Sequence, residues 1–484
     1  MPGYLTSSAI ESCLVWLNNS YPALTQLIVL PENSVEHSVI RALRIRSAGG
    51  GDRNGVLLVG GTHARELINP DLLAGLALKL CWAYTNGAGL TFGGKSWSAT
   101  DVKLAVDGLD IFIAPNINPD GRDWVQSPTG YQWWRKNRSH NPGGSRGTDL
   151  NRNYDFLWQW IIGQTSATPT DDTYHGTAPF SEPETRNVRW LLDTYPNIAC
   201  FVDVHSYSEL VLFPWGDDDN QSSDATQNFQ NPAWDGLRGT PGTGYGEYIP
   251  AADATNFANR GVKVRDAIAA VRGRTYVVEQ SFDLYGTSGG SSDYTYSRYY
   301  RGTGARKVWG YVIETNHLGP GNDWQYGFQP PYADALAVMD EIQSGLIQFM
   351  LTCVCVVREV GVAQLSAEAL DELRRFRDVE MVRRRRGKRW AALLEAHGDE
   401  VLSLLAANKR LWGEAEAVVA EAADIVLRRE ERDAPKIEKA LVARIDRVVT
   451  QLDKRASPEL RKALVALRRD LRSVAGKTAR EAIR

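Results

Sequence analysis

The stretch GGTHARELINPD, residues 60–71, places a histidine and a glutamate three positions apart, between an apolar run and a predicted helix. Imidazole nitrogens and carboxylate oxygens bind zinc, and catalytic zinc sites take three protein ligands and leave one position for water. His63 and Glu66 supply two such groups. A pair of the same spacing, His397 and Glu400, lies in a highly charged stretch with no other histidine, so we expect it on a solvated helix face.

The stretch FVDVHSYSEL offers a third ligand, because His205 ends an apolar predicted strand. Glu314 ends another predicted strand, where a carboxylate is costly to bury without a partner or a role. In open α/β sheets, ligands bind outside the carboxyl ends of the strands, so these side chains are expected at one edge. The sequence therefore predicts a metal centre of His63, Glu66 and His205, with the Glu314 carboxylate beside it.

Three further stretches carry groups suited to an anionic substrate. They are WWRKNR with Arg135, TDLNRNYD with Asn151 and Arg152, and LYGTSGGSSDY with Tyr285. The planar fork of arginine pairs in a bidentate manner with a carboxylate, and Asn and Tyr add directional hydrogen bonds. A carboxylate next to a zinc site indicates the free C-terminus of a peptide.

The elements that must position these groups alternate between short β-prone runs and longer helical patterns. Strands are expected at residues 55–60, 109–114, 198–205, 275–279 and 308–314. Such alternation predicts an α/β domain with a largely parallel sheet. A helix is expected to begin at Asn69 as N-cap, with Pro70 in its first position and Gly87 near its end.

The composition changes near Val357. Residues 1–357 carry 26 Lys+Arg and 36 Asp+Glu, whereas residues 358–484 carry 29 and 22 and hold only two of the 15 Trp and five of the 43 Gly. Leucines recur at helical spacing in the second part, as at 460, 464, 467 and 471. We therefore expect an α/β catalytic domain at 1–356 and an all-α bundle or coiled coil at 357–484, used for oligomerisation or partner docking.

The sequence also bears on partners and location. No run approaches the roughly 20 apolar residues of a membrane span, and no basic start precedes an apolar segment at the N-terminus, so a cytoplasmic protein is expected. The basic run 383–386 lies among acidic residues, which favours a solvated face over nucleic-acid binding. Five cysteines are interpreted as buried free thiols, which fits a reducing compartment: Cys13, Cys81, Cys200, Cys353 and Cys355.

The polar, Gly- and Pro-rich segment 215–250 is expected to form a surface excursion near the cleft. Asp217, Asp218 and Asp219 within it are carboxylates that calcium accepts as ligands. Because no EF-hand frame surrounds them, the sequence favours a plain solvated loop over a calcium site.

Taken in chain order, these motifs resemble a known family. HARE, NPDGR, WWRKNR, DLNRNYDF, YHGTAPFSEPE, HSYSEL, YGTSGGSSDY and the strand-borne Glu314 are similar to the motifs of zinc metallocarboxypeptidases of the carboxypeptidase A type, over about residues 5–352. The resemblance implies a mixed, mostly parallel eight-stranded sheet flanked by helices, and one Zn²⁺ ion. It also implies that the substrates are peptide or protein C-termini, from which single residues are removed.

The resemblance assigns roles by position. It implies that the zinc ligands are His63, Glu66 and His205. Asp149 would orient His63, as such second carboxylates do around metal-bound imidazoles. Glu314 would be the general base, and Arg135 would polarise the scissile carbonyl and stabilise the developing oxyanion.

The resemblance also assigns substrate contacts. The clamp on the terminal carboxylate would consist of Asn151, Arg152 and Tyr285. Arg65 and Tyr207 would lie in more distant substrate subsites. Ser292 occupies a position that is apolar in members releasing aromatic or aliphatic residues and acidic in members releasing Lys or Arg, so it signals neither choice.

Two other readings stay open at the level of sequence. The same metal site fits a zinc amidase or peptidase acting on γ-linked or D-residue peptides of cell walls. A non-catalytic peptide-binding scaffold would use the same fold, although such relatives usually lose a ligand or the base, and none is lost here.

Overall fold

The computed structural model describes residues 3–48, 53–302, 304–361 and 365–484. The described residues divide into two compact units: the first holds residues 3–48 and 54–350, and the second holds the residues from Leu351 onward together with Arg53. The expected division into a catalytic domain at residues 1–356 and a helical accessory domain at residues 357–484 stays a prediction. Among the described residues, no helix combines the length and apolar character that crossing a bilayer requires.

The first unit is built on one eight-stranded sheet with the order β1-β2-β6-β3-β7-β12-β8-β11. The strands are β1 (Thr25–Val29), β2 (Arg41–Ile45), β3 (Asn54–Gly60), β6 (Leu109–Ala114), β7 (Ile198–Ser206), β8 (Leu210–Phe213), β11 (Val277–Gln280) and β12 (Trp309–Thr315). The β3–β6, β3–β7, β7–β12 and β8–β11 pairs are parallel, and the other pairs are antiparallel. The predicted mixed sheet is confirmed.

Two small ribbons accompany the sheet. They are β4 (Leu90–Phe92) with β5 (Lys95–Trp97), and β9 (Gln221–Ser222) with β10 (Glu247–Tyr248).

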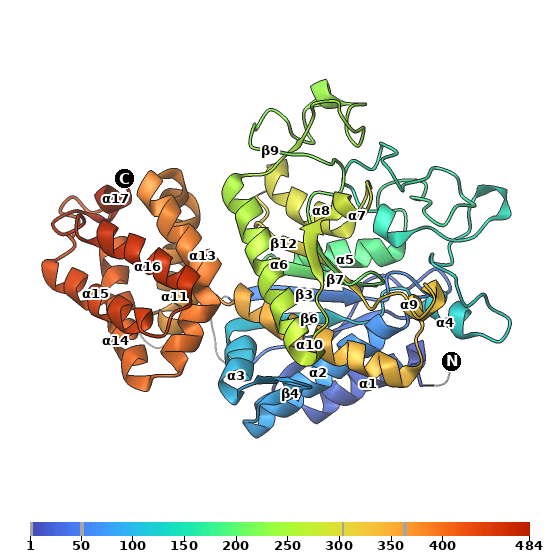
Figure 1. Cartoon of the computed structure of the whole chain (residues 1–484), viewed down its shortest axis with the longest axis horizontal. Coiled ribbons are helices and arrows are strands. Elements are labelled where there is room, and N and C mark those ends of the chain that lie inside the picture. Colours follow the sequence, from blue (N-terminus) through green and yellow to red (C-terminus); the bar gives the residue numbers. More distant parts are fainter. Residues whose placement is uncertain (1–2, 49–52, 303, 362–364) are drawn as a thin grey trace. The chain divides into compact units, whose positions relative to one another are not determined.

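Helices flank the sheet (Figure 1). They are α1 (Ser7–Ser20), α2 (Ile68–Asn86), α3 (Ala99–Gly108), α4 (Pro119–Gln126), α5 (Pro183–Thr194), α6 (Ala251–Arg272), α7 (Ser281–Leu284), α8 (Ser291–Ser297), α9 (Trp324–Phe328) and α10 (Tyr332–Cys353). Every residue of β6, β7 and β12 is buried, as expected of central strands covered on both faces.

Two local features fix how helices sit on the sheet. Gly310 of β12 faces α8 so closely that a Cβ at this position would lie 2.3 Å from Thr295 Oγ1 and 2.8 Å from the Ser292 carbonyl oxygen. Only glycine permits this approach. Gly87 ends α2 in the left-handed conformation, with φ 59°, and its N–H bonds back to the last turn, as predicted.

The predicted N-cap of α2 is wrong. The helix begins at Ile68, and Asn69 lies inside its first turn. Its side chain is used elsewhere: Nδ2 donates to Glu66 Oε2 at 3.3 Å, and Oδ1 accepts from the hydroxyls of Ser206 and Thr315. The side chain thus ties the turn after β3 to the ends of β7 and β12.

The second unit is helical, as predicted. Its helices are α11 (Val356–Gly361), α12 (Ala367–Arg375), α13 (Arg385–Ala406), α14 (Lys409–Leu427), α15 (Lys439–Asp453), α16 (Pro458–Leu471) and α17 (Ala479–Ala482). Most leucines at helical spacing are buried: Leu441 and Leu452 on α15, and Leu460, Leu464 and Leu471 on α16; Leu467 is only partly buried. Apolar stripes therefore form the interior of this unit.

The cysteines depart from the prediction of five free thiols. Cys200 and Cys353 are disulfide-bonded, whereas Cys13, Cys81 and Cys355 are free. The prediction of buried free thiols is therefore wrong for Cys200 and Cys353, and Cys13 is free but only partly buried. Cysteine usage no longer indicates a reducing compartment, and the cytoplasmic location stays a prediction.

Candidate metal centre

Strand ends and one turn bring the predicted ligands together. His63 and Glu66 lie in the turn that joins β3 to α2, and His205 lies near the end of β7, the strand next to β3. On the other side of β7, Glu314 of β12 stands in register opposite His205. Because parallel neighbouring strands end at the same edge, the four side chains meet there.

The ligand atoms of His63, Glu66 and His205 all lie within 4.8 Å of one another, and the three residues are buried. His63 Nδ1 lies 2.7 Å from Glu66 Oε1 and 3.0 Å from His205 Nδ1. His205 Nδ1 lies 3.3 Å from Glu66 Oε2. Two imidazole nitrogens and a carboxylate thus converge on one point.

The opposite nitrogens of both rings face carboxylates. His63 Nε2 lies 3.1 Å from Asp149 Oδ1, and His205 Nε2 lies 3.1 Å from Asp203 Oδ2. These partners favour the proton on Nε2, which leaves the Nδ1 lone pairs facing each other and Glu66. Such an arrangement repels itself unless a proton or a metal cation lies among the atoms, and two imidazoles with one carboxylate form a donor set that zinc accepts. The residues therefore fit the predicted metal.

Asp203 is a residue that sequence reasoning missed. It precedes His205 by two positions on β7 and so points to the same face of the strand, a spacing that could have revealed it. Its Oδ1 accepts from the Thr62 hydroxyl at 2.8 Å, and its Oδ2 accepts from the Ser291 hydroxyl at 2.9 Å. These bonds hold the carboxylate behind the imidazole.

The electrostatics of the centre are set by burial and by close pairs. Burial raises the pKa of Glu66, but the adjacent imidazoles of His63 and His205 outweigh it and hold the pKa well below its usual range. Burial lowers the pKa of His205, whereas Asp203 and Glu66 raise it further, to well above its usual range. Without a metal ion, the two carboxylates thus retain a proton on this ring.

Asp149 joins the metal centre to Arg135. Its Oδ1 faces His63 and accepts the Asn151 backbone N–H at 3.0 Å, while its Oδ2 accepts from Arg135 Nε at 3.0 Å and lies 2.9 Å from Nη2. Burial raises the pKa of Asp149, but Arg135 and His63 reverse this and hold it well below its usual range. One buried carboxylate therefore orients an imidazole and a guanidinium together.

Glu314 is buried at the same edge. Burial raises the pKa of its carboxyl group to about 8, and the Glu66 carboxylate acts in the same direction, against the opposing effects of His205 and Arg135. A divalent cation held nearby would favour the ionised form of such a group.

The predicted clamp residues lie beside these groups. Asn151 Oδ1 accepts the Ser291 backbone N–H at 2.8 Å, which fixes the amide plane. Arg152 is buried and its guanidinium carbon lies 5.7 Å from the centre of the half-exposed Tyr285 ring. Within the described part of the chain, Arg152 Nη2 is buried and has no hydrogen-bond partner. A buried donor without an acceptor is costly, so this atom is suited to an anionic ligand.

The two residues expected in more distant subsites share an aromatic partner, Phe328, that the sequence did not reveal. The Arg65 guanidinium carbon lies 4.4 Å from the centre of the Phe328 ring, and the Tyr207 ring centre lies 4.9 Å from it. Ser292 is buried in the first turn of α8.

The acidic run in the segment 215–250 is not the solvated loop that was expected. Asp217 and Asp218 are buried, and only Asp219 is exposed. The carboxylate of Asp218 accepts the backbone N–H groups of Asn220 and Gly239. Backbone donors folded over this carboxylate make burial tolerable, which composition alone does not indicate.

The second His–Glu pair is also not on a solvated face. It lies on α13 as predicted, but His397 and Glu400 are only partly exposed. Both oxygens of Glu400 accept hydrogen bonds from Ser457, the N-cap of α16, through its backbone N–H and its hydroxyl. The glutamate is therefore a structural link between two helices.

Comparisons with known proteins point to one family. A family model described as zinc carboxypeptidase matches residues 10–342. Carboxypeptidase B of Astacus astacus is 29% identical over 317 residues, which are 65% of this chain and 85% of that protein. Carboxypeptidase A4 of Mus musculus is 32% identical over 209 residues, which are 43% of this chain and 46% of that protein, so the alignment spans less than half of that relative.

Solved structures share the fold. Thrombin activatable fibrinolysis inhibitor superimposes with a TM-score of 0.57 at 22% identity, covering 72% of this chain and 73% of that chain. The bovine protein of the same name, in complex with tick carboxypeptidase inhibitor, gives a TM-score of 0.55 at 22% identity, covering 72% of this chain and 97% of that chain.

Proposed function

The chain belongs to the zinc carboxypeptidase family, hydrolases that act on peptide bonds, and we propose that it removes single residues from the C-termini of peptides or proteins. The observation that carries the proposal is the arrangement at one sheet edge. Three side chains that can hold a metal ion, a buried carboxylate in register with one of them, and a guanidinium with an unpaired buried N–H lie on neighbouring elements.

We propose that His63, Glu66 and His205 hold one zinc ion. A bound zinc ion supplies Lewis-acid chemistry, because it polarises a carbonyl and lowers the pKa of water towards about 7. Glu314 takes a proton from the attacking water and delivers it to the leaving amine. Its position supports this role: burial raises the pKa of the carboxyl group, and a cation held by the three neighbouring side chains would restore the ionised form that accepts the proton.

Arg135 stabilises the oxygen on which negative charge develops. Its guanidinium is held on one side by the Asp149 carboxylate, so it is pre-oriented and does not need to reorganise during the reaction.

The terminal carboxylate of the substrate is bound by Asn151, Arg152 and Tyr285. The unpaired Arg152 Nη2 supports this assignment, because a carboxylate oxygen would supply the acceptor that it lacks.

The test is the release of residues from a library of peptides with all twenty C-terminal residues, followed by mass spectrometry. Wild-type protein with one equivalent of zinc is expected to release single C-terminal residues. Glu314→Gln and chelator-treated protein are expected to release none, and Asp266→Asn, a change at an exposed carboxylate, is expected to behave as wild type. Peptides with an amidated C-terminus are expected to resist, since they lack the charge that the clamp binds.

Two outcomes contradict the proposal. Release by Glu314→Gln at the wild-type rate would exclude Glu314 as the base. Stoichiometric zinc binding without release from any library peptide would exclude ordinary peptide C-termini and favour the γ-linked or D-residue substrates.

A further inference from the structure

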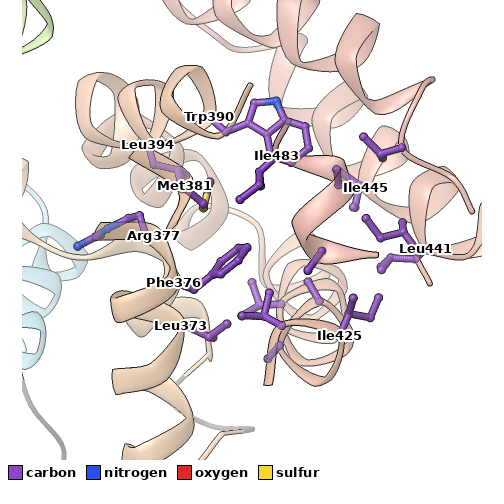
Figure 2. A pocket seen from close by; sticks show the side chains of 18 of the residues that line it. Leu373, Phe376, Arg377, Met381, Trp390, Leu394, Ile425, Leu441, Ile445 and Ile483 are labelled. Atoms are coloured by element: carbon purple, nitrogen blue, oxygen red, sulfur yellow. The ribbon is translucent and has the colours of Figure 1, made fainter. Parts of the chain in front are cut away.

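The second unit contains an apolar cavity that its predicted use in oligomerisation or docking does not explain. The cavity has a volume of about 260 Å³ and lies between helices α12 to α17 and the segment that joins α12 to α13 (Figure 2). Its lining includes Phe376, Trp390, Ile425, Leu441 and Ile483. All of these side chains belong to the second unit, so the cavity is a property of that unit alone.

The lining offers no free polar group among the side chains that Figure 2 labels. The Trp390 ring lines the cavity, while its Nε1–H donates to Asp470 Oδ2 at 3.2 Å. Arg377 turns its guanidinium away from the labelled apolar side chains, and Nη1 lies 3.6 Å from the Cys355 sulfur. Water needs two to four polar partners in a cavity, and this lining does not provide them.

The charges around the cavity neutralise one another. Arg429 lies over the Phe376 ring and pairs with Glu372 at 2.6 Å and with Glu380 at 2.8 Å. Glu380 also pairs with Arg480, at 3.0 Å. Because these cations and carboxylates are matched with each other, they do not favour an anionic or a cationic ligand.

The backbone beside the cavity is irregular. Residues Phe376–Glu380 form a π-helical turn, followed by a 3-10 turn, Met381–Arg383, before α13 begins. Single π-helical turns interrupt the regular packing of a helix and often occur at functional sites. Phe376 of the π-helical turn and Met381 of the 3-10 turn line the cavity wall, where a regular continuation of α12 would arrange the side chains differently.

We propose that this cavity is a binding site for one small, neutral, apolar molecule with the bulk of one or two aromatic rings. Apolar cavities of about 150 Å³ lined by Leu, Ile and Phe already bind benzene, and the cavity here is larger. The lining comes from six helices of one unit and the hollow holds only about 260 Å³, which favours a small molecule over a segment of a partner protein. The second unit would then be a ligand-binding module attached to the peptidase.

The test uses the full-length protein and N-phenyl-1-naphthylamine, a neutral probe with two aromatic ring systems whose fluorescence rises in apolar surroundings. Wild type is expected to bind one probe per chain saturably. Ala479→Leu and Ala482→Leu, which extend cavity-lining alanines of α17, are expected to weaken binding at least tenfold. The matched control Ala466→Leu makes the same change at an exposed position of α16 and is expected to bind as wild type does.

A measurement on wild type alone guards against variants that fail to fold. Saturating probe is expected to slow amide hydrogen exchange at least several-fold in peptides from α12 to α17. The proposal is overturned if wild type shows no saturable binding, if both folded leucine variants bind as tightly as wild type, or if the protection maps only to residues before Met350.

Discussion

Asp149→Asn is the most informative single substitution, because this carboxylate accepts or faces four donor groups from three residues. The asparagine has nearly the same shape, but one of its two polar ends is an NH₂ group. In either orientation that NH₂ opposes two donors, the His63 and Asn151 N–H groups or the two Arg135 nitrogens. The negative charge that balances the buried Arg135 guanidinium is lost in both orientations.

Two magnitudes follow from this geometry. Removing the partner of a metal-bound imidazole lowers metal affinity about 10- to 100-fold. This corresponds to about 1.4–2.8 kcal/mol of binding free energy. Removing one partner of a buried ion pair costs about 3–5 kcal/mol of folding stability. We expect the lower end of that range, because the amide oxygen still accepts hydrogen bonds from one pair of donors.

Zinc affinity is measured by competition with a chromogenic chelator, and stability by denaturant unfolding of the metal-free protein. Tryptophan fluorescence reports mainly on the first unit, since 13 of the 15 tryptophans precede Val357. Asp172→Asn is the control, because this carboxylate also pairs with an arginine, Arg65, but its side chain is 59% exposed, so a change below about 1 kcal/mol is expected. Zinc affinity within twofold of wild type, together with an unchanged unfolding midpoint, would refute the proposed coupling through Asp149.

Further predictions concern other parts of the molecule. Arg135→Ala is expected to lower kcat about 10²- to 10³-fold in steady-state hydrolysis of a blocked dipeptide, and full turnover would exclude its role at the oxyanion. Burial, together with the carboxylates of Glu247, Asp293 and Asp218, raises the pKa of Asp217 well above its usual range, so wild type loses stability as the pH rises above about 4, the ordinary carboxyl value. Asp217→Asn has no such loss and is expected to melt a few degrees higher than wild type at pH 8 but not at pH 4.5; an equal difference at both pH values would contradict this. Thiol titration of the denatured protein is expected to find three thiols before reduction and five after it, and five before reduction would exclude the disulfide.

The convergence of the metal centre was predictable from sequence because it depends on topology more than on side-chain detail. His63, His205 and Glu314 follow or end apolar runs, and parallel strands place their carboxyl ends together whatever their exact neighbours are. The predicted strand limits therefore agree closely with the observed ones: the predicted strand 109–114 coincides with β6, and the predicted strand 198–205 ends one residue before β7 does. Helical spacing likewise sufficed for α15 and α16, since buried stripes repeat every three or four residues.

The features that were missed depend on contacts between residues distant in sequence. Asp217 and Asp218 were predicted to be solvated because the segment that contains them is polar. Both are buried, since the chain folds back on them: the backbone N–H of Gly239, 21 residues later, donates to Asp218. Glu400 was predicted to be exposed because the sequence does not show its hydrogen bond to Ser457, which lies 57 residues away. Hydropathy describes a residue's own preference for water, whereas the burial of Asp218 and Glu400 depends on donors from elsewhere that reach them. Asp217 is buried although neither of its oxygens has a hydrogen-bond partner among the described residues.

The apolar cavity also could not be predicted. The spacing of apolar residues and the composition show that the helices of the second unit have apolar faces. The volume left between those faces is fixed by the π-helical turn and by the small size of the alanines on α17. Neither feature alters the hydrophobic pattern of the sequence.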